Sequence, residues 1–161
     1  MKEKIKTLLT ILFVCIVSSL LSGCGSFEET ICKETEGQNR NGLVYLPNQQ
    51  EPFTGKNLCK YENGQIKSEG KFKDGYQDGK WTEWHENGQI GKEENYKDGK
   101  EDGKSTYYWY GNCQKQSEGN YKDGKEDGKW TYWHENGQKS SEGNCKDGKR
   151  DGKWTYWYEN G

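Results

Sequence analysis

The chain has 161 residues, enough for one ordinary domain, but only 29% of them are hydrophobic. Its leucine, isoleucine and valine side chains are concentrated in the first 21 positions, so the remainder cannot fill a thick two-layer core. A formal net charge of −2, with two arginines and no basic run, argues against binding to nucleic acid.

The first predicted element is a lipoprotein signal peptide over residues 1–23, whose apolar part forms a signal helix. Three lysines in the first six positions precede an apolar run over 7–21, which is too short for a comfortable membrane span. The next residues, Leu-Ser-Gly-Cys at 21–24, resemble the lipobox of bacterial lipoproteins. This resemblance implies cleavage before Cys24 and lipid attachment to its thiol. We therefore expect a lipid-anchored protein of the bacterial cell envelope, in the outer membrane if the host is double-membraned.

Residues 24–41 are predicted to form a polar tether. They include four glutamates and few apolar side chains, although a short strand near Ile31 is compatible with the pattern. A strand is expected over 42–46, Gly-Leu-Val-Tyr-Leu, and Pro47-Asn48 would end it.

Residues 42–161 are predicted to form an array of tandem repeats. The tripeptide Asp-Gly-Lys begins at Asp78, Asp102, Asp127 and Asp151, in steps of 24, 25 and 24 residues. A fixed period in this range is typical of stacked repeats. Most repeats also contain Glu-Asn-Gly-Gln, which predicts a two-residue hairpin turn with positive φ at both central residues. The expected fold is all-β: an elongated single-layer antiparallel β-meander of β-hairpins, each of about 24 residues.

The predicted register places Trp130 opposite Gly143 and Tyr132 opposite Ser141. Because side chains alternate along a strand, one face should carry rings over glycine and serine, while the other is largely charged. The glycine leaves room for the indole to lie flat on the neighbouring backbone. The third repeat has one residue more than the others, which predicts a β-bulge near 105–107 and a less regular turn at 111–114.

The cysteines and histidines give no catalytic or metal-binding pattern. Four cysteines remain beyond Cys24, but they fall at unlike positions in the repeats, so we do not expect a disulfide framework; a Cys32–Cys59 bond stays open. His85 and His134 occupy equivalent positions beside turns, about 20 Å apart, too far to act together. The aspartates of the Asp-Gly pairs are first of all turn residues. We predict no catalytic residue, no metal and no cofactor.

The repeat at 128–144, Gly-Lys-Trp-Thr-Tyr-Trp-His-Glu-Asn-Gly-Gln-Lys-Ser-Ser-Glu-Gly-Asn, resembles the MORN-repeat variant family of bacterial proteins. Phe-Thr-Gly-Lys at 53–56 is similar to the usual opening of such arrays. The resemblance implies an elongated hairpin array that serves as a scaffold for binding proteins or lipids. It also implies a link to toxin–antitoxin systems, in which some members act as antitoxins.

Aromatic side chains are the candidate binding surface, although they could serve only to hold the array together. We predict a non-enzymatic, membrane-anchored repeat scaffold for protein–protein interaction at the cell surface or in the periplasm. The alternatives are a carbohydrate- or cell-wall-binding module and an antitoxin-like inhibitor of a toxin. The expected partners are the membrane, through lipidated Cys24, and an unknown protein or a glycan. The surface residues are Trp81, Trp84, Trp109, Trp130, Tyr132, Trp133, Trp154, Tyr156 and Trp157.

Overall fold

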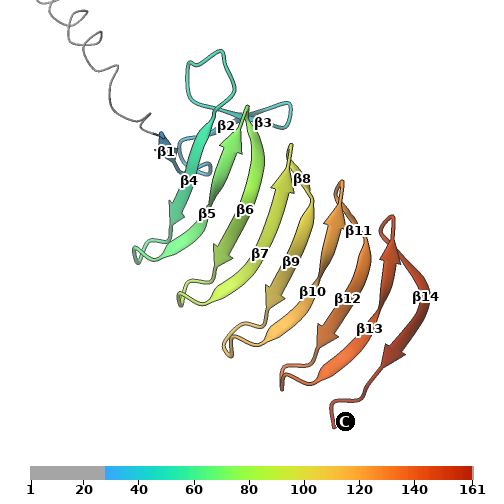
Figure 1. The fold of residues 1–161 in the computed structure, drawn as a ribbon. Helices are drawn as coiled ribbons and strands as arrows, with labels where there is room; N and C mark the ends of the chain where they lie inside the picture. The colour runs from blue at the N-terminus through green and yellow to red at the C-terminus, as the bar shows by residue number, and fades with distance from the viewer. Residues whose placement is uncertain (1–27, 161) are drawn as a thin grey trace, which may run out of the picture.

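The structure, a computed structural model, describes residues 28–160, and this part of the chain contains strands but no helix (Figure 1). The predicted signal helix within 1–23 and the predicted lipidation site, Cys24, lie outside the described residues. The strands are β1 (Thr30–Ile31), β2 (Gln38–Arg40), β3 (Leu43–Tyr45), β4 (Gly55–Lys60), β5 (Ile66–Lys73), β6 (Tyr76–Trp84), β7 (Ile90–Lys97), β8 (Lys100–Glu101), β9 (Gly103–Tyr108), β10 (Lys115–Lys122), β11 (Lys125–Glu126), β12 (Gly128–Trp133), β13 (Lys139–Lys146) and β14 (Lys149–Tyr156).

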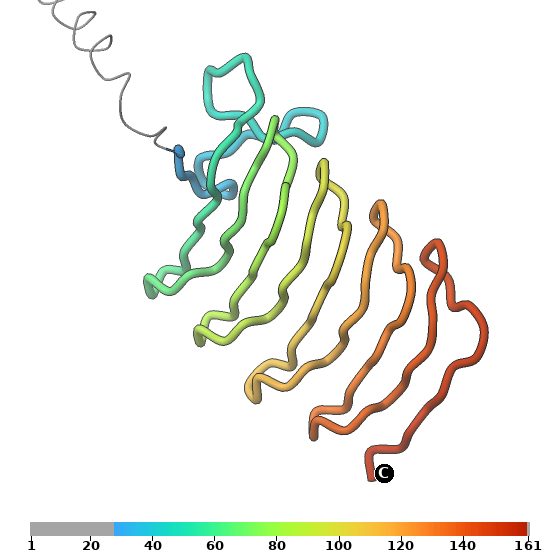
Figure 2. The backbone as a smooth tube through the Cα atoms, in the orientation of Figure 1, coloured from blue at the N-terminus to red at the C-terminus, as the bar shows by residue number. Residues whose placement is uncertain are grey.

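Twelve of these strands form one open sheet in the order β1-β4-β5-β6-β7-β9-β10-β12-β13-β14, with β8 and β11 paired beside β7 and β10. All pairs in this sheet are antiparallel except β1 with β4, which is parallel. The hairpins follow one another along a single axis (Figures 1 and 2). The predicted all-β antiparallel meander is therefore confirmed. We number its hairpins 1 (β4–β5), 2 (β6–β7), 3 (β9–β10) and 4 (β12–β13).

Two kinds of turn alternate along the array. The turns between hairpins are the Asp-Gly pairs at 74–75, 98–99, 123–124 and 147–148, and both residues of each pair adopt positive φ. The turns within hairpins 1, 2 and 4 contain Asn-Gly, but there only the glycine adopts positive φ, as in Gly137. The N–H of Gly137 donates to the carbonyl of His134 at 2.9 Å, and the N–H of His134 donates to Gln138 at 2.8 Å. The prediction of a two-residue turn at Asn-Gly is therefore wrong, because three residues separate the last bonded pair.

The predicted register nevertheless holds beyond the turn. Trp130 pairs with Gly143 and Tyr132 pairs with Ser141, as the sequence predicted. Next to the turn, however, Trp133 pairs with Lys139, so the second strand contains one unpaired residue at this point. This bulge offsets the extra residue of the turn and restores the register of a two-residue turn.

The additional residue of hairpin 3 lies in its turn. The N–H of Trp109 donates to the carbonyl of Gln114 at 2.8 Å, so four residues separate this pair, against three in hairpin 4. Strand β9 pairs with β10 without a shift from Gly103 to Tyr107. The predicted bulge near 105–107 is therefore wrong, while the predicted irregular turn is confirmed. Cys113 adopts a φ of 56° in this turn, a conformation that glycine would adopt more easily.

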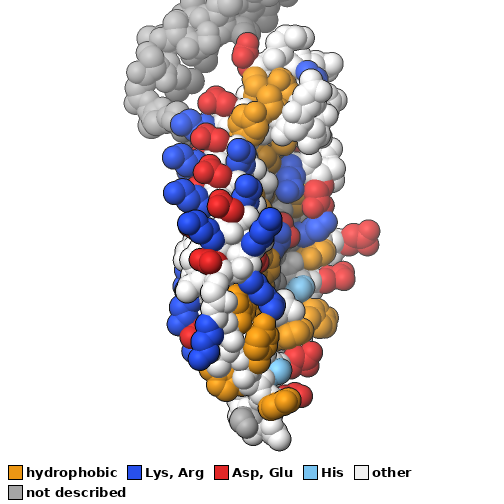
Figure 3. Space-filling model, turned by 90° about the vertical axis from the view of Figure 1, so that its right-hand side faces the viewer, with side chains coloured by type: hydrophobic (Ala, Val, Ile, Leu, Met, Phe, Trp, Pro, Cys, Tyr) orange, Lys and Arg blue, Asp and Glu red, His pale blue; other side chains and the backbone are white. Residues whose placement is uncertain are grey.

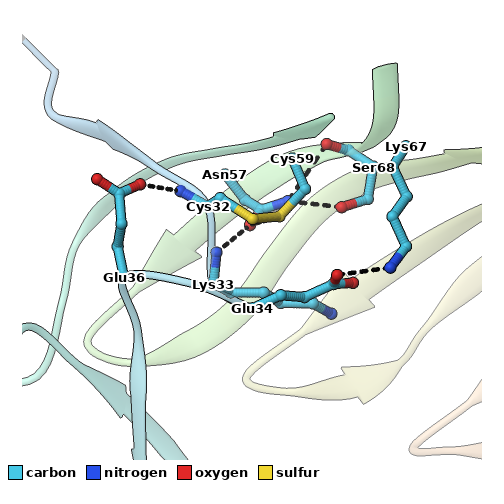
Figure 4. Close-up of a disulfide and its surroundings, with 8 residues drawn as sticks. All are labelled: Cys32, Lys33, Glu34, Glu36, Asn57, Cys59, Lys67 and Ser68. Carbon is cyan, nitrogen blue, oxygen red and sulfur yellow. Dashed lines mark hydrogen bonds and ion pairs between the residues drawn. A yellow bond between two sulfur atoms is a disulfide. The ribbon is translucent and has the colours of Figure 1, made fainter. Parts of the chain in front are cut away.

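The segment predicted to be a tether is folded against hairpin 1 over its described part, residues 28–41 (Figure 4). A disulfide joins Cys32 to Cys59, with the Cα atoms 4.6 Å apart, which confirms the pairing that the sequence left open. The N–H of Lys33 donates to the side-chain oxygen of Asn57 at 3.0 Å, and Ile31 is only 4% exposed. This segment therefore acts as a cap on the first hairpin. The strand predicted over 42–46 is present as β3, which pairs with β2 in a separate small sheet.

The core is a line of aromatic rings on one face of the sheet. It begins with Phe53 and Phe72, whose ring centroids are 6.1 Å apart, and continues to Trp81 at 5.1 Å from Phe72. The same arrangement recurs further along, where Tyr121 lies 5.3 Å from Trp130 in edge-to-face geometry. Such pairs stabilise a protein by about 0.5–1.5 kcal/mol beyond the burial of their area. A thin sheet therefore obtains its core from rings that contact the next hairpin.

Candidate binding surface

The two faces of the sheet differ in chemistry, because successive side chains point to opposite sides of a strand. One face, which we call the glycine face, carries indoles over glycine backbone: Trp81, Trp130 and Trp154 over Gly70, Gly119 and Gly143. The opposite face, which we call the lysine face, carries threonines, lysines and glutamates: Lys80, Thr82, Glu93, Lys104, Thr106, Glu118, Lys129, Thr131 and Glu142.

Each indole on the glycine face lies over the hairpin that precedes its own. A Cβ atom added to Gly119 of β10 would lie 2.2 Å from the ring of Trp130 in β12. The Nε1–H of Trp130 also donates to the carbonyl of Asn120, at 3.2 Å. Gly143, which pairs with Trp130 in the ladder, lies instead beneath Trp154. The sequence thus predicted correctly that the ring lies on glycine, but it predicted the wrong glycine.

The joint between hairpins 2 and 3 replaces this pair with polar residues. Glu94 stands in the position of the glycine, and Ser105 in the position of the tryptophan. Glu94 is 4% exposed, and it accepts hydrogen bonds of 2.9 Å from the hydroxyls of Tyr96 and Tyr107. Lys92 lies 3.0 Å from the same carboxylate. Ser105 is fully buried, and its hydroxyl has no hydrogen-bond partner among residues 28–160.

The buried carboxylate changes the titration of the groups around it. Burial and the negative charge of Glu94 both raise the pKa of Glu101. Burial alone would lower the pKa of Lys92, but the carboxylates of Glu94 and Glu83 outweigh this effect, so the pKa is raised. In the part of the chain that the structure describes, no three His, Cys, Asp or Glu side chains are placed to hold a metal ion.

Two carboxylates on the lysine face, those of Glu118 and Glu142, are each held by two lysines. Glu142 lies 2.6 Å from Lys139 and 3.1 Å from Lys129, and these two ammonium groups lower its pKa to about 2. In the N-terminal cap, Glu28 contacts Lys56 and Lys71 in the same way, at 3.3 and 3.1 Å. Figure 3 shows basic and acidic side chains alternating along the array, with hydrophobic side chains between them toward its C-terminal end. Exposed pairs of this kind contribute little stability.

The nine predicted surface residues do not form one surface. Trp81 and Trp130 are each only 1% exposed, so their rings stabilise the array and cannot contact a partner. The other seven remain at least partly exposed. They are Tyr132, Trp154 and Tyr156 on the glycine face, Trp84, Trp133 and Trp157 on the lysine face, and Trp109 beside a turn.

A row of hydrogen bonds along the Asn-Gly turns was missed by the sequence analysis. In hairpins 1 and 3, the residue before the turn donates to a tryptophan carbonyl of the next hairpin: Tyr61 to Trp84 at 2.7 Å, and Trp109 to Trp133 at 3.2 Å. In hairpin 2, Nε2 of His85 has no hydrogen-bond partner among residues 28–160. In hairpin 4, Nε2 of His134 lies 3.0 Å from the carbonyl of Trp157, so this nitrogen carries the proton. The sequence offered one signal for these bonds, because a side chain with a ring N–H or a phenol O–H recurs at this position. In hairpin 3, Trp109 occupies this position.

A single open sheet of tandem hairpins, each packed on its neighbours, defines a β-repeat protein. The family model of the MORN repeat variant matches residues 53–74, 77–98, 126–147 and 150–161 of the chain. Hairpin 3, with its longer turn and Ser105, lies between the second and third matched segments. MORN repeats are non-catalytic modules that suggest a scaffold for protein or membrane interaction. No curated protein shows significant similarity to the chain.

Proposed function

We propose that this protein is a non-enzymatic scaffold for protein–protein interaction, held at the cell envelope by a lipid on Cys24. The observation that carries the proposal is an exposed aromatic cluster on the glycine face, formed by Trp154 and Tyr156 with Arg150. Tyr156 is 60% exposed. Tryptophan, tyrosine and arginine are the residues that most often dominate the binding energy of protein interfaces.

The cluster is held in place before any partner binds. The guanidinium of Arg150 lies 4.4 Å from the ring centroid of Trp154 and donates to the hydroxyl of Tyr156 at 2.5 Å. The ring of Tyr132 supports Trp154 from hairpin 4, with 6.1 Å between centroids. Side chains that are ordered in the free protein lose less entropy on association, which favours tight binding.

The anchor is proposed from the N-terminal sequence, where the lysines, the apolar run and Leu-Ser-Gly-Cys at 21–24 follow the order of a lipoprotein signal. Two or more acyl chains would hold the protein stably, whereas one would not. Among residues 28–160, no helix has the length and apolar composition required to span a membrane. A Cys24→Ala variant should therefore lose its membrane association, and mass spectrometry of the mature N-terminus should show the lipid only in the wild type.

The interaction is tested by capture from membranes with the lipidated protein, followed by affinity measurement with the purified candidate partner. A Trp154→Ala/Tyr156→Ala variant should bind at least about 10-fold more weakly, because it removes two aromatic contacts of about 1 kcal/mol or more each. Tyr110→Ala is the matched control, because Tyr110 is 69% exposed but lies in the turn of hairpin 3. Equal affinities for all three proteins would contradict the proposal.

The antitoxin-like role remains a separate candidate, which would require a cytoplasmic form of the protein. Rescue of growth from a co-expressed toxin by the unlipidated chain, and not by the lipidated one, would favour that role over the envelope scaffold.

A further inference from the structure

The lysine face contains two grooves built from equivalent residues. Their volumes are about 550 Å³ and 450 Å³. The first is lined by Glu69, Lys80, Thr82, Trp84, Ile90 and Glu93. The second is lined by Glu118, Lys129, Thr131, Trp133, Lys139 and Glu142. Each residue of the second follows its counterpart by 49 positions, which is two repeats of the sequence.

Each groove combines an aromatic wall with a floor of bare backbone. The wall is the partly exposed indole of Trp84 or Trp133. The floor includes Gly70 or Gly119, each of which is covered by an indole on the opposite face of the sheet. The same glycine that stabilises the array from one side therefore leaves an open hollow on the other.

The polar groups of the grooves are nearly balanced in charge. Three lysines and three carboxylates line the first groove, and three lysines and two carboxylates line the second. Within the second groove, Lys129 and Lys139 lie 3.1 and 2.6 Å from Glu142. Each groove thus presents hydrogen-bond donors and acceptors side by side, with little net charge to attract a polyanion or a polycation.

We propose that the two grooves bind one linear, uncharged polysaccharide, with a sugar ring against each tryptophan. A pyranose has an apolar face that suits an indole, and its hydroxyls both donate and accept, as the lysine–glutamate pairs require. An extended peptide fits less well, because the grooves lie on the face of the sheet, where the strand backbone is already paired. This surface and this partner are distinct from the protein-binding cluster at Trp154.

The separation of the grooves makes the proposed site bivalent. From β6 to β12 the sheet advances by four strands, which corresponds to about 19 Å at a strand spacing of about 4.8 Å. Thr106 of hairpin 3 lies between Thr82 and Thr131 on the same face, so the path from one groove to the other remains on the array. A chain that spans both grooves gains the second contact within one complex, and this raises its affinity without any new kind of contact.

The experiment measures binding of the full-length chain in detergent to a panel of linear neutral glucans, by calorimetry. Long glucans should bind saturably and roughly 100-fold more tightly than disaccharides of the same linkage, which fill one groove. Trp84→Ala and Trp133→Ala should each reduce the affinity for the long chain to that for the disaccharide. Tyr110→Ala, an exposed ring outside both grooves, should bind like the wild type. Circular dichroism establishes that each variant is folded.

Three outcomes would overturn the proposal. They are no saturable binding of any neutral glucan by the folded protein, full binding by the Trp84→Ala/Trp133→Ala variant, or tighter binding to a polyuronate that salt abolishes. If a tryptophan variant fails to fold, Lys139→Ala replaces it, because the Lys139 side chain is 47% exposed and its removal leaves the core intact. This variant should bind the long glucan several-fold more weakly, and unchanged binding would likewise overturn the proposal.

Discussion

The joint between hairpins 3 and 4 and the joint between hairpins 2 and 3 solve the same packing problem with opposite chemistry. In the first, which we call the apolar joint, Trp130 covers Gly119. In the second, which we call the polar joint, Glu94 and Ser105 stand at the corresponding positions. The glycine and the tryptophan are thus replaced together. A side chain at the glycine position leaves no space for an indole, so one change requires the other.

The two joints should differ in stability. The apolar joint buries almost the whole of one indole, with a single hydrogen bond to satisfy its Nε1–H. The polar joint buries a carboxylate, whose desolvation offsets much of the attraction of its partners. It also leaves the Ser105 hydroxyl without a partner among residues 28–160. We therefore expect the polar joint to be the weaker contact of the array.

The largest expected effect comes from truncating the same position in both joints. Trp130→Ala should lower the free energy of unfolding by about 3–5 kcal/mol, because it removes a buried ring and leaves a cavity. Ser105→Ala should lower it by nothing, or raise it by up to about 1 kcal/mol, because it removes a buried hydroxyl without a partner. Urea denaturation of both variants measures the difference. Similar losses in the two would show that the joints do not differ as described.

An exchange of residues at the polar joint should show strong coupling. Ser105→Trp alone forces an indole against Glu94. Glu94→Gly alone removes the acceptor of the Tyr96 hydroxyl and leaves the Tyr107 hydroxyl with only its 3.4 Å bond to Glu101. The double variant recreates the glycine–tryptophan pair of the apolar joint. It should be more stable than the sum of the single changes predicts, by about 1–3 kcal/mol. A thermodynamic cycle from urea denaturation measures this value, and simple additivity would refute the packing argument.

The turns offer a smaller contrast between the same two joints. Asn112 donates across the apolar joint to the carbonyl of Glu135 at 2.8 Å, whereas Asn87 donates to Gln89 of its own turn at 2.9 Å. Both substitutions to alanine remove one donated bond, but only the bond of Asn112 joins two hairpins. Asn112→Ala should therefore cost more than Asn87→Ala, by up to about 1 kcal/mol. Both asparagines also accept an N–H two residues on, so that loss cancels in the comparison. An equal cost would mean that the bond to Glu135 contributes no more than the bond from Asn87 to Gln89 within one turn.

The smallest effect is a dependence on pH with opposite signs in two places. The pKa of Glu101 at the polar joint is raised above 4.5 in the folded protein, so its contribution to stability falls as pH rises from about 4.5 through the folded pKa. The pKa of Glu142 is lowered from 4.5 to about 2, so its contribution is lost as pH falls through that interval. In thermal melting from pH 2 to 8, the melting temperature of Glu101→Gln should decline less above pH 4.5 than that of the wild type. Glu142→Gln should instead reduce the acid sensitivity below pH 4.5.

The repeat period and the turn residues were sufficient to predict the order of the strands and most of the register. Trp130 faces Gly143 as expected because a longer turn and a bulge compensate each other, and an offset of this kind cannot be seen in the sequence alone. Asn-Gly and Asp-Gly are both compatible with a two-residue turn, so the residue types did not reveal which turn would be of that kind. The count of residues showed that hairpin 3 carries one more, but only the backbone bonds place it in the turn.

The candidate surface was less predictable than the fold. Alternation along a strand assigns Trp81 and Trp84 to opposite faces, but it does not say which ring a neighbouring hairpin covers. The direction of the Trp130 side chain depends on its rotamer and on the space above Gly119 on the glycine face. Both are set by the packing between hairpins 3 and 4. The Cys32–Cys59 bond depends on how a segment without periodicity folds back on hairpin 1. The residue pattern within one repeat cannot predict contacts between that repeat and its neighbours or the N-terminal segment.

Each indole packs on the hairpin that precedes its own. The repeat seen in the sequence is therefore not the structural unit that could be copied or exchanged. A transplanted hairpin would present its tryptophan to a foreign predecessor and its glycine to a foreign successor. The self-sufficient block instead runs from the second strand of one hairpin to the first strand of the next, so that both members of each pair travel together. For β7 and β9, cutting the chain at the Asn-Gly turns would keep Glu94 and Ser105 in one piece, whereas cutting it at the Asp-Gly turn would divide them. Shuffled libraries of this array should therefore recover folded chains mainly from the first kind of cut.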